Sequence, residues 1–190
     1  MIKINKKNNR KKTGFTLVET LVALFIFSVS ILTTMSVLSQ GLTSANYAKN
    51  KMVAGYLSQE GIEYFRNMRD TYLLYSDDKT QGWTDFVLKL KNNGCGDSNG
   101  CYFDNDVEKF SSSSIKDIGV YSCSGKCNNL SFVKNKGEYD YSGVERTTFS
   151  RKMKIEESGE YVKIISEVTW SSGGQGGMIS LSENLLNWIE

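Results

Sequence analysis

The 190-residue chain contains no histidine and no proline, although segments rich in turn-forming residues are plentiful. Without histidine, catalytic triads with an imidazole base and zinc sites with imidazole ligands are both excluded. Ser–Lys pairs and paired carboxylates remain chemically possible, but no spacing in the chain indicates either of them. We therefore predict a protein that is not an enzyme and that carries no cofactor.

Acidic residues are absent from residues 1–14, and this absence changes the meaning of the net charge. The chain has 23 basic and 21 acidic residues, a formal charge of +2. Six of the basic residues lie in residues 1–14: Lys3, Lys6, Lys7, Arg10, Lys11 and Lys12. The rest of the chain has 17 basic and 21 acidic residues. The remaining composition therefore does not indicate nucleic-acid binding.

Charged residues are also nearly absent from a long apolar stretch. Residues 15–38 read FTLVETLVALFIFSVSILTTMSVL, and no charged residue occurs from Thr20 to Ala48. An apolar helix of roughly 20 residues is long enough to cross a bilayer core. We predict a transmembrane segment at about residues 15–38. Because basic residues precede it, the amino terminus should stay cytoplasmic and the carboxyl-terminal part should lie outside the membrane.

A signal anchor and a cleaved secretory signal peptide are the ordinary explanations of such a segment. The apolar run is longer than the ~7–15 residues of a secretory signal core. The small residues Thr43, Ser44 and Ala45 form a poor cleavage site. The sequence therefore disfavours a secretory signal peptide and leaves a signal anchor as the alternative.

Glu19 distinguishes a plain anchor from a more specialised helix. An acidic residue within an apolar membrane helix costs about 2.5–3.5 kcal/mol on insertion scales, and such residues tend to be paired and functional. Glu19 follows Phe15 by four residues, so both lie on the same helix face. Cleavage between Gly14 and Phe15 would create an α-amino cation one turn from Glu19, or facing Glu19 of a neighbouring chain. A plain anchor has no need of this carboxylate.

Residues 11–24, KKTGFTLVETLVAL, resemble the leader of type IV prepilins and type II secretion pseudopilins. The resemblance implies that a prepilin peptidase cleaves after Gly14 and N-methylates Phe15. It also implies that Glu19 guides docking into a growing filament.

Other positions of the same motif acquire roles from this resemblance. Lys11 and Lys12 form the basic end of the leader, and Thr16 joins Glu19 in the segment that acts in assembly. Many major pilins carry a proline further along the helix, where this chain has Ser36.

The expected fold class is α+β and pilin-like. A long amino-terminal helical spine, half transmembrane and half amphipathic, should pack against a small antiparallel β-sheet head. The expected parts are the leader (1–14), the spine helix (15–74) and the extracytoplasmic head (75–190). Apolar residues recur every three or four positions in the outer half of the spine: Val53, Leu57, Gly61, Tyr64, Met68 and Tyr72. This stripe should face the head.

The last forty residues predict a β-meander at about residues 149–189. Phe149–Glu157, Glu160–Ser172 and Met178–Leu186 have β-type composition, and Gly-containing segments separate them. The runs FSRKMKIEE, VKIISEVTW and MISLSENLLNW are also similar to the distal part of PilV-like minor pilins.

Four cysteines, Cys95, Cys101, Cys123 and Cys127, lie in the part expected outside the membrane. An even number of cysteines in a small extracytoplasmic head favours disulfides. Three connectivities are possible, and we favour Cys95–Cys101 with Cys123–Cys127 because each pair brackets a short Gly-containing loop. A four-thiolate zinc site is the alternative, although the spacings differ from the usual CxxC pattern.

These features together predict a minor pilin or pseudopilin, assembled into a type IV pilus or a related secretion or DNA-uptake filament. Its expected partners are a prepilin peptidase/methyltransferase, other pilin subunits and the assembly platform in the membrane. We expect it in the cytoplasmic membrane as a single-pass protein, and then in a surface or periplasmic filament. The alternative is a signal-anchored adhesin, receptor or enzyme with an independent head.

Overall fold

The computed structural model of the chain describes residues 14–104, 110, 118–159 and 161–187. The chain divides into two compact units, residues 1–46 and residues 47–190, and helix α1 (Leu17–Leu74) contributes to both. Each unit is therefore described by itself.

In the first unit, α1 continues without a break past Ser36, and its side chains are exposed on all sides. Several hydroxyl groups in this apolar segment donate hydrogen bonds to carbonyl groups of the preceding turn. For example, Ser28 Oγ lies 2.8 Å from Leu24 O, and Ser30 Oγ lies 2.8 Å from Ile26 O. A helix in lipid must satisfy its polar groups internally. Among the described residues, α1 is the one helix whose length and composition suit a membrane span.

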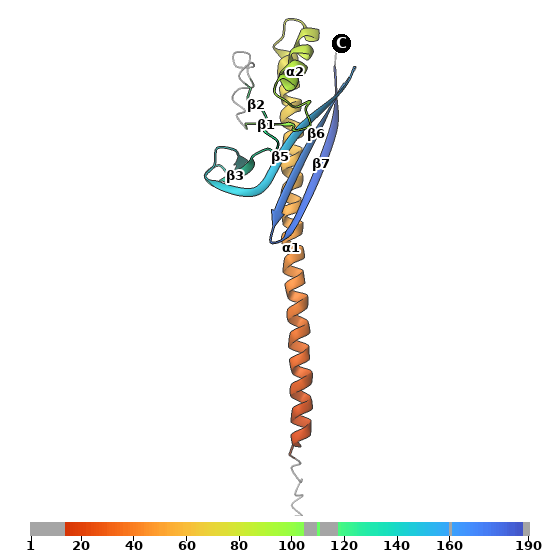
Figure 1. The fold of residues 1–190 in the computed structure, drawn as a ribbon, viewed down its shortest axis with the longest axis vertical. Helices are drawn as coiled ribbons and strands as arrows, with labels where there is room; N and C mark the ends of the chain where they lie inside the picture. Colours follow the sequence, from red (N-terminus) through yellow and green to blue (C-terminus); the bar gives the residue numbers. More distant parts are fainter. Residues whose placement is uncertain (1–13, 105–109, 111–117, 160, 188–190) are drawn as a thin grey trace, which may run out of the picture. The chain divides into compact units, whose positions relative to one another are not determined.

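The second unit combines the remainder of α1 with a second helix and an antiparallel sheet (Figure 1). Its elements besides α1 are α2 (Lys79–Asn92), β1 (Cys101–Phe103), β2 (Val120–Ser122), β3 (Asn129–Val133), β4 (Glu138–Asp140), β5 (Glu145–Ser158), β6 (Tyr161–Ser172) and β7 (Gln175–Leu186). The strand order in the sheet is β2-β1-β5-β3-β4, and β6 pairs with both β5 and β7.

The core of this unit lies between α1 and strands β5 to β7. Alternate residues of β6 face the helix, and all of them are buried: Val162, Ile164, Ser166, Val168 and Trp170. The predicted apolar stripe of α1 packs against them, from Leu57 to Tyr72, with Val53 partly buried. Ser58 Oγ also donates a hydrogen bond to Ser166 O at 2.8 Å. The α+β class, with a long amino-terminal helix packed against an antiparallel sheet, is confirmed.

The three carboxyl-terminal strands are present, but two begin earlier than the sequence predicted. β5 begins at Glu145 instead of Phe149, because its polar first residues pair with β3 instead of contributing an apolar face. β7 begins at Gln175 instead of Met178, so Gly177 belongs to the strand, opposite Trp170. A Cβ atom at Gly177 would lie 2.3 Å from Cζ2 of Trp170, so glycine is needed where the indole lies over the strand.

Helix α2 follows α1 after a short connection. Asp78 caps it, since Asp78 Oδ1 accepts a hydrogen bond from Thr80 N at 2.8 Å. The buried residues of α2 recur at helical spacing: Trp83, Phe86, Val87 and Leu90. They belong to the same core cluster as Tyr72 of α1.

Candidate processing and assembly segment

The Gly14–Phe15 bond lies just ahead of α1, in a segment without regular structure. Phe15 is 79% exposed, and no atom would lie within 4 Å of a Cβ placed on Gly14. The helix begins only at Leu17, so the bond is not held in helical hydrogen bonding. A peptidase can therefore reach this backbone without first unwinding α1.

Thr16 and Glu19 form the start of α1. Thr16 Oγ1 accepts a hydrogen bond from Glu19 N at 3.3 Å, and Thr16 O accepts one from Thr20 N at 3.2 Å. Thr-x-x-Glu is the spacing of a capping box, in which the first hydroxyl caps the amide of the fourth residue. This spacing is visible in the sequence, but the prediction for Glu19 did not use it. The bond uses the backbone amide of Glu19, so Thr16 is the residue that caps the start of α1.

The charge at the start of α1 affects the amino group that the proposed cleavage would create. An α-helix carries partial positive charge at its amino terminus, which stabilises a carboxylate in the first turn, as at Glu19. An α-amino cation on Phe15 would be repelled by the same end of the helix. A nearby carboxylate would offset this repulsion, either within one chain or between neighbouring chains.

The comparisons with known proteins address this amino-terminal segment alone. The family described as the prokaryotic N-terminal methylation motif matches residues 9–35. This match supports a type IV pilin-like precursor that a prepilin peptidase processes. No curated protein and no solved structure matches the chain. Of the residues assigned from the sequence, Gly14, Phe15, Thr16 and Glu19 lie together at the start of α1. Lys11 and Lys12 lie outside the described residues.

The four cysteines lie in the second unit, where they form two disulfides. Cys95 is joined to Cys101 and Cys123 to Cys127, with Cα–Cα separations of 4.6 and 4.8 Å. These are the two pairings that the sequence favoured. All four residues are buried, and Cys127 Sγ lies 3.9 Å from Cys101 O. With their sulfurs bonded to each other, the cysteines are not available as zinc ligands in this structure.

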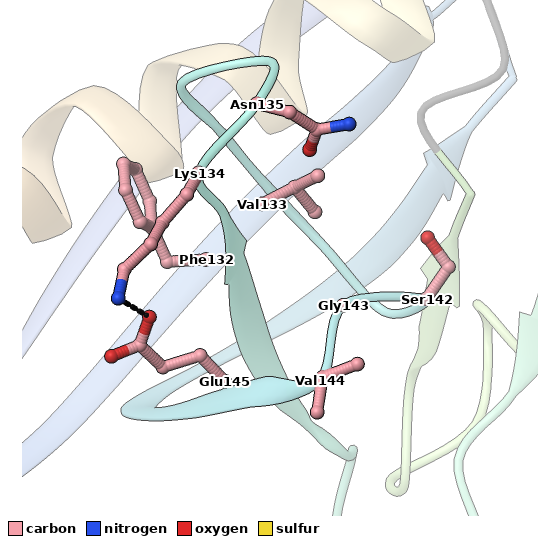
Figure 2. A pocket seen from close by; sticks show the side chains of 8 residues that line it. All are labelled: Phe132, Val133, Lys134, Asn135, Ser142, Gly143, Val144 and Glu145. Atoms are coloured by element: carbon pink, nitrogen blue, oxygen red, sulfur yellow. Dashed lines mark ion pairs between the residues drawn. The ribbon is translucent and has the colours of Figure 1, made fainter.

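A hollow of about 630 Å³ lies beside the β3–β4 hairpin (Figure 2). Val133 and Val144 line it, and Val144 is fully exposed. On one side, Lys134 Nζ lies 3.0 Å from a carboxylate oxygen of Glu145. Both side chains are largely exposed, so this ion pair contributes at most about 1 kcal/mol and can open. The hollow can accommodate an apolar group.

Two tyrosines of the same unit, the buried Tyr72 and the partly buried Tyr141, have altered acidity. Burial raises the pKa of Tyr72 to about 12, and the negative charge of Asp85 acts in the same direction. Burial also raises the pKa of Tyr141, although the nearby Arg151 guanidinium partly opposes this effect. Both phenols therefore remain neutral at physiological pH, and their place in the packed core suits a structural role.

Proposed function

We propose that the chain is a pilin-like filament subunit, made as a precursor that is cleaved between Gly14 and Phe15. The observation that carries the proposal is the match of residues 9–35 to the N-terminal methylation motif, on a chain whose Gly14–Phe15 bond is exposed. In this proposal the new terminal Phe15 is N-methylated. Glu19 then neutralises a terminal amine, either its own or a neighbour's.

The apolar part of α1 supports assembly through this helix. Large side chains are exposed around its circumference, among them Leu24, Phe25 and Phe27 at 61%, 69% and 63%. A helix that is apolar all round requires apolar surroundings, which a bilayer supplies before assembly and neighbouring helices supply after it. We propose that the precursor lies in the cytoplasmic membrane with its head outside, and that it then enters a filament with other pilin subunits.

The finer assignment is to a minor pilin or pseudopilin, most like the PilV-like minor pilins. It rests on the similarity of the carboxyl-terminal strands to the distal part of those proteins. The parts of the chain in this proposal are the leader (1–14), the spine helix (15–74) and the head (75–190).

Processing can be tested by expressing the full chain with and without a prepilin peptidase. We expect a gel shift to a smaller product only when the peptidase is present, and Gly14→Leu should abolish that shift. Gly41→Leu is the matched control, because no atom would lie within 4 Å of a Cβ at Gly41 and the position is remote from the bond. Equal cleavage of Gly14→Leu and the unmodified chain would contradict the proposal.

A further inference from the structure

A short disulfide-closed loop, residues 123–127, lies over the face of the sheet that points away from α1. Gly125 has φ +81°, which allows the tight turn between Cys123 and Cys127. Ser150 Oγ of β5 donates a hydrogen bond to Cys127 O at 2.9 Å, and Cys123 N donates one to Gly100 O at 2.9 Å. Both ends of the loop are thus fixed to the body of the head.

This loop presents Lys126 to solvent above two adjoining hollows. Their volumes are about 180 and 300 Å³, and both are lined by Lys126, Ser150 and Thr169. Lys126 is exposed and has no ion-pair partner among the residues that the structure describes. We call the two hollows together the Lys126 groove. Because its loop is fixed at both ends, the backbone that carries Lys126 is held beside the groove.

Hydroxyl groups line the floor of the Lys126 groove. Ser150 and Thr169 are partners across β5 and β6, and Thr148 and Ser171 are two positions away on the same strands. Side chains two apart on a strand share a face, and the alternate residues of β6 are buried against α1. These hydroxyl-bearing residues therefore lie on the outer face. Met178, which is 61% exposed, adds an apolar surface at one end.

A second cation lies at the edge of the groove. Lys152 lines the smaller hollow together with Glu167, whose carboxylate lies 3.0 Å from Lys152 Nζ and 3.2 Å from Lys154 Nζ. One carboxylate is thus shared by two lysines, and Lys126 adds a third positive charge. Although the chain beyond residue 14 is acidic on balance, this part of the sheet is locally cationic. It should attract an anionic ligand.

The lining also indicates which class of anion fits. Nucleic-acid single strands bind to exposed aromatic side chains on which bases stack, but Trp170, the aromatic residue of the lining, is only 4% exposed. Ammonium groups bind carboxylates, while Ser and Thr hydroxyls exchange hydrogen bonds with sugar hydroxyls. We propose that the Lys126 groove binds an acidic polysaccharide, with uronate carboxylates at Lys126 and Lys152 and sugar hydroxyls over Thr169. The proposal does not depend on filament assembly.

The experiment measures binding of polygalacturonate to the full chain in detergent micelles by titration calorimetry. Lys126→Gln should weaken binding about tenfold, because it removes a charge-assisted hydrogen bond to a uronate carboxylate. Lys136→Gln is the control, because it removes the same charge from an exposed lysine that pairs with Glu138 outside the groove. Its affinity should stay within about twofold of the unmodified chain, since exposed pairs contribute little.

A second variant tests the groove instead of the net charge. Thr169→Val keeps the charge and nearly the shape of the side chain, and it should weaken binding about threefold through the lost hydrogen bond. Neutral dextran should not bind measurably. The proposal is overturned if polygalacturonate does not bind, if Lys126→Gln and Lys136→Gln weaken binding equally, or if Thr169→Val has no effect. Tighter binding of duplex DNA than of polygalacturonate would also overturn it.

Discussion

Arg151 of β5 and Glu60 of α1 form an ion pair at 2.8 Å between sheet and helix. The Arg151 side chain is completely buried, whereas that of Glu60 is 41% exposed. The guanidinium also donates to Leu57 O at 3.3 Å, and its carbon lies 4.0 Å from the centre of the Phe103 ring. A carboxylate, a carbonyl and an aromatic face thus stabilise a permanent positive charge in the core, and the Tyr141 side chain also interacts with it.

This arrangement predicts a large effect of neutralising Glu60. Glu60→Gln leaves Arg151 charged and buried, so we expect a loss of about 2–3 kcal/mol, somewhat below the 3–5 kcal/mol typical of wholly buried pairs. Glu63→Gln is the matched control on the same helix, since Glu63 pairs with the partly exposed Arg66 at 2.7 Å. That change should cost less than about 1 kcal/mol. Urea unfolding followed by tryptophan fluorescence measures both, and equal losses would contradict this account of Arg151.

The approach of α1 to the sheet at Gly61 predicts opposite effects of the same substitution at two glycines. A Cβ at Gly61 would lie 2.7 Å from Met153 Sδ and 2.8 Å from Ser166 Oγ, both in the buried core. At Gly55, the nearest atom would be Ile179 Cδ1 at 3.8 Å. Gly55→Ala should therefore gain about 1 kcal/mol of helix propensity. In Gly61→Ala, overpacking of about 1–3 kcal/mol should cancel or exceed that gain. Equal stabilisation by both changes in urea unfolding would show that α1 is not closely packed at Gly61.

Two substitutions at Glu19 separate helix capping from charge pairing. Glutamine can replace glutamate in a capping box, but it cannot neutralise a terminal amine. We expect Glu19→Ala and Glu19→Gln both to be cleaved normally and both to enter filaments about tenfold less well, because an unpaired buried charge costs several kcal/mol. Immunoblots of sheared filaments and of membranes measure incorporation. Normal incorporation of Glu19→Gln together with loss of Glu19→Ala would leave Glu19 with the capping role alone.

Tyr72 predicts how the head loses stability in alkali. Its pKa is raised from 10.0 to about 12, so the folded state holds the phenol proton more tightly than the unfolded state does. The stability from this group is complete below pH 10 and is lost as the pH rises through about 12. Tyr72→Phe should reduce that loss, whereas the same change at the more exposed Tyr75 should not. Urea unfolding across this pH range measures the loss of stability. If Tyr72→Phe loses stability with pH as the unmodified chain does, this account of Tyr72 is wrong.

Local patterns predicted much of this fold. The stripe from Leu57 to Tyr72 showed which face of α1 is buried, and β-type composition located β6. Short spacings were enough to favour the two disulfide pairings that the structure contains. In each case the signal lies within a few residues of the feature that it predicts.

Features that depend on distant partners were not predicted. Arg151 lies on the same face of β5 as the buried residues Met153 and Ile155. Nothing near Arg151 in the sequence indicated that it pairs with Glu60, which is 91 residues away. The Lys126 groove likewise depends on a loop, β5 and β6 meeting in space. Gly177 was assigned to a turn because its need for glycine comes from the Trp170 ring across the strand pair.

The amino terminus of the mature protein tests the central proposal most directly. Mass spectrometry of the chain purified from cells that contain a prepilin peptidase should find an amino-terminal peptide that begins with N-methylated Phe15. That result requires both cleavage after Gly14 and modification of the new amine. A chain that still begins at Met1, or one cut near residues 43–45, would contradict the proposal and favour an anchored or secreted head instead.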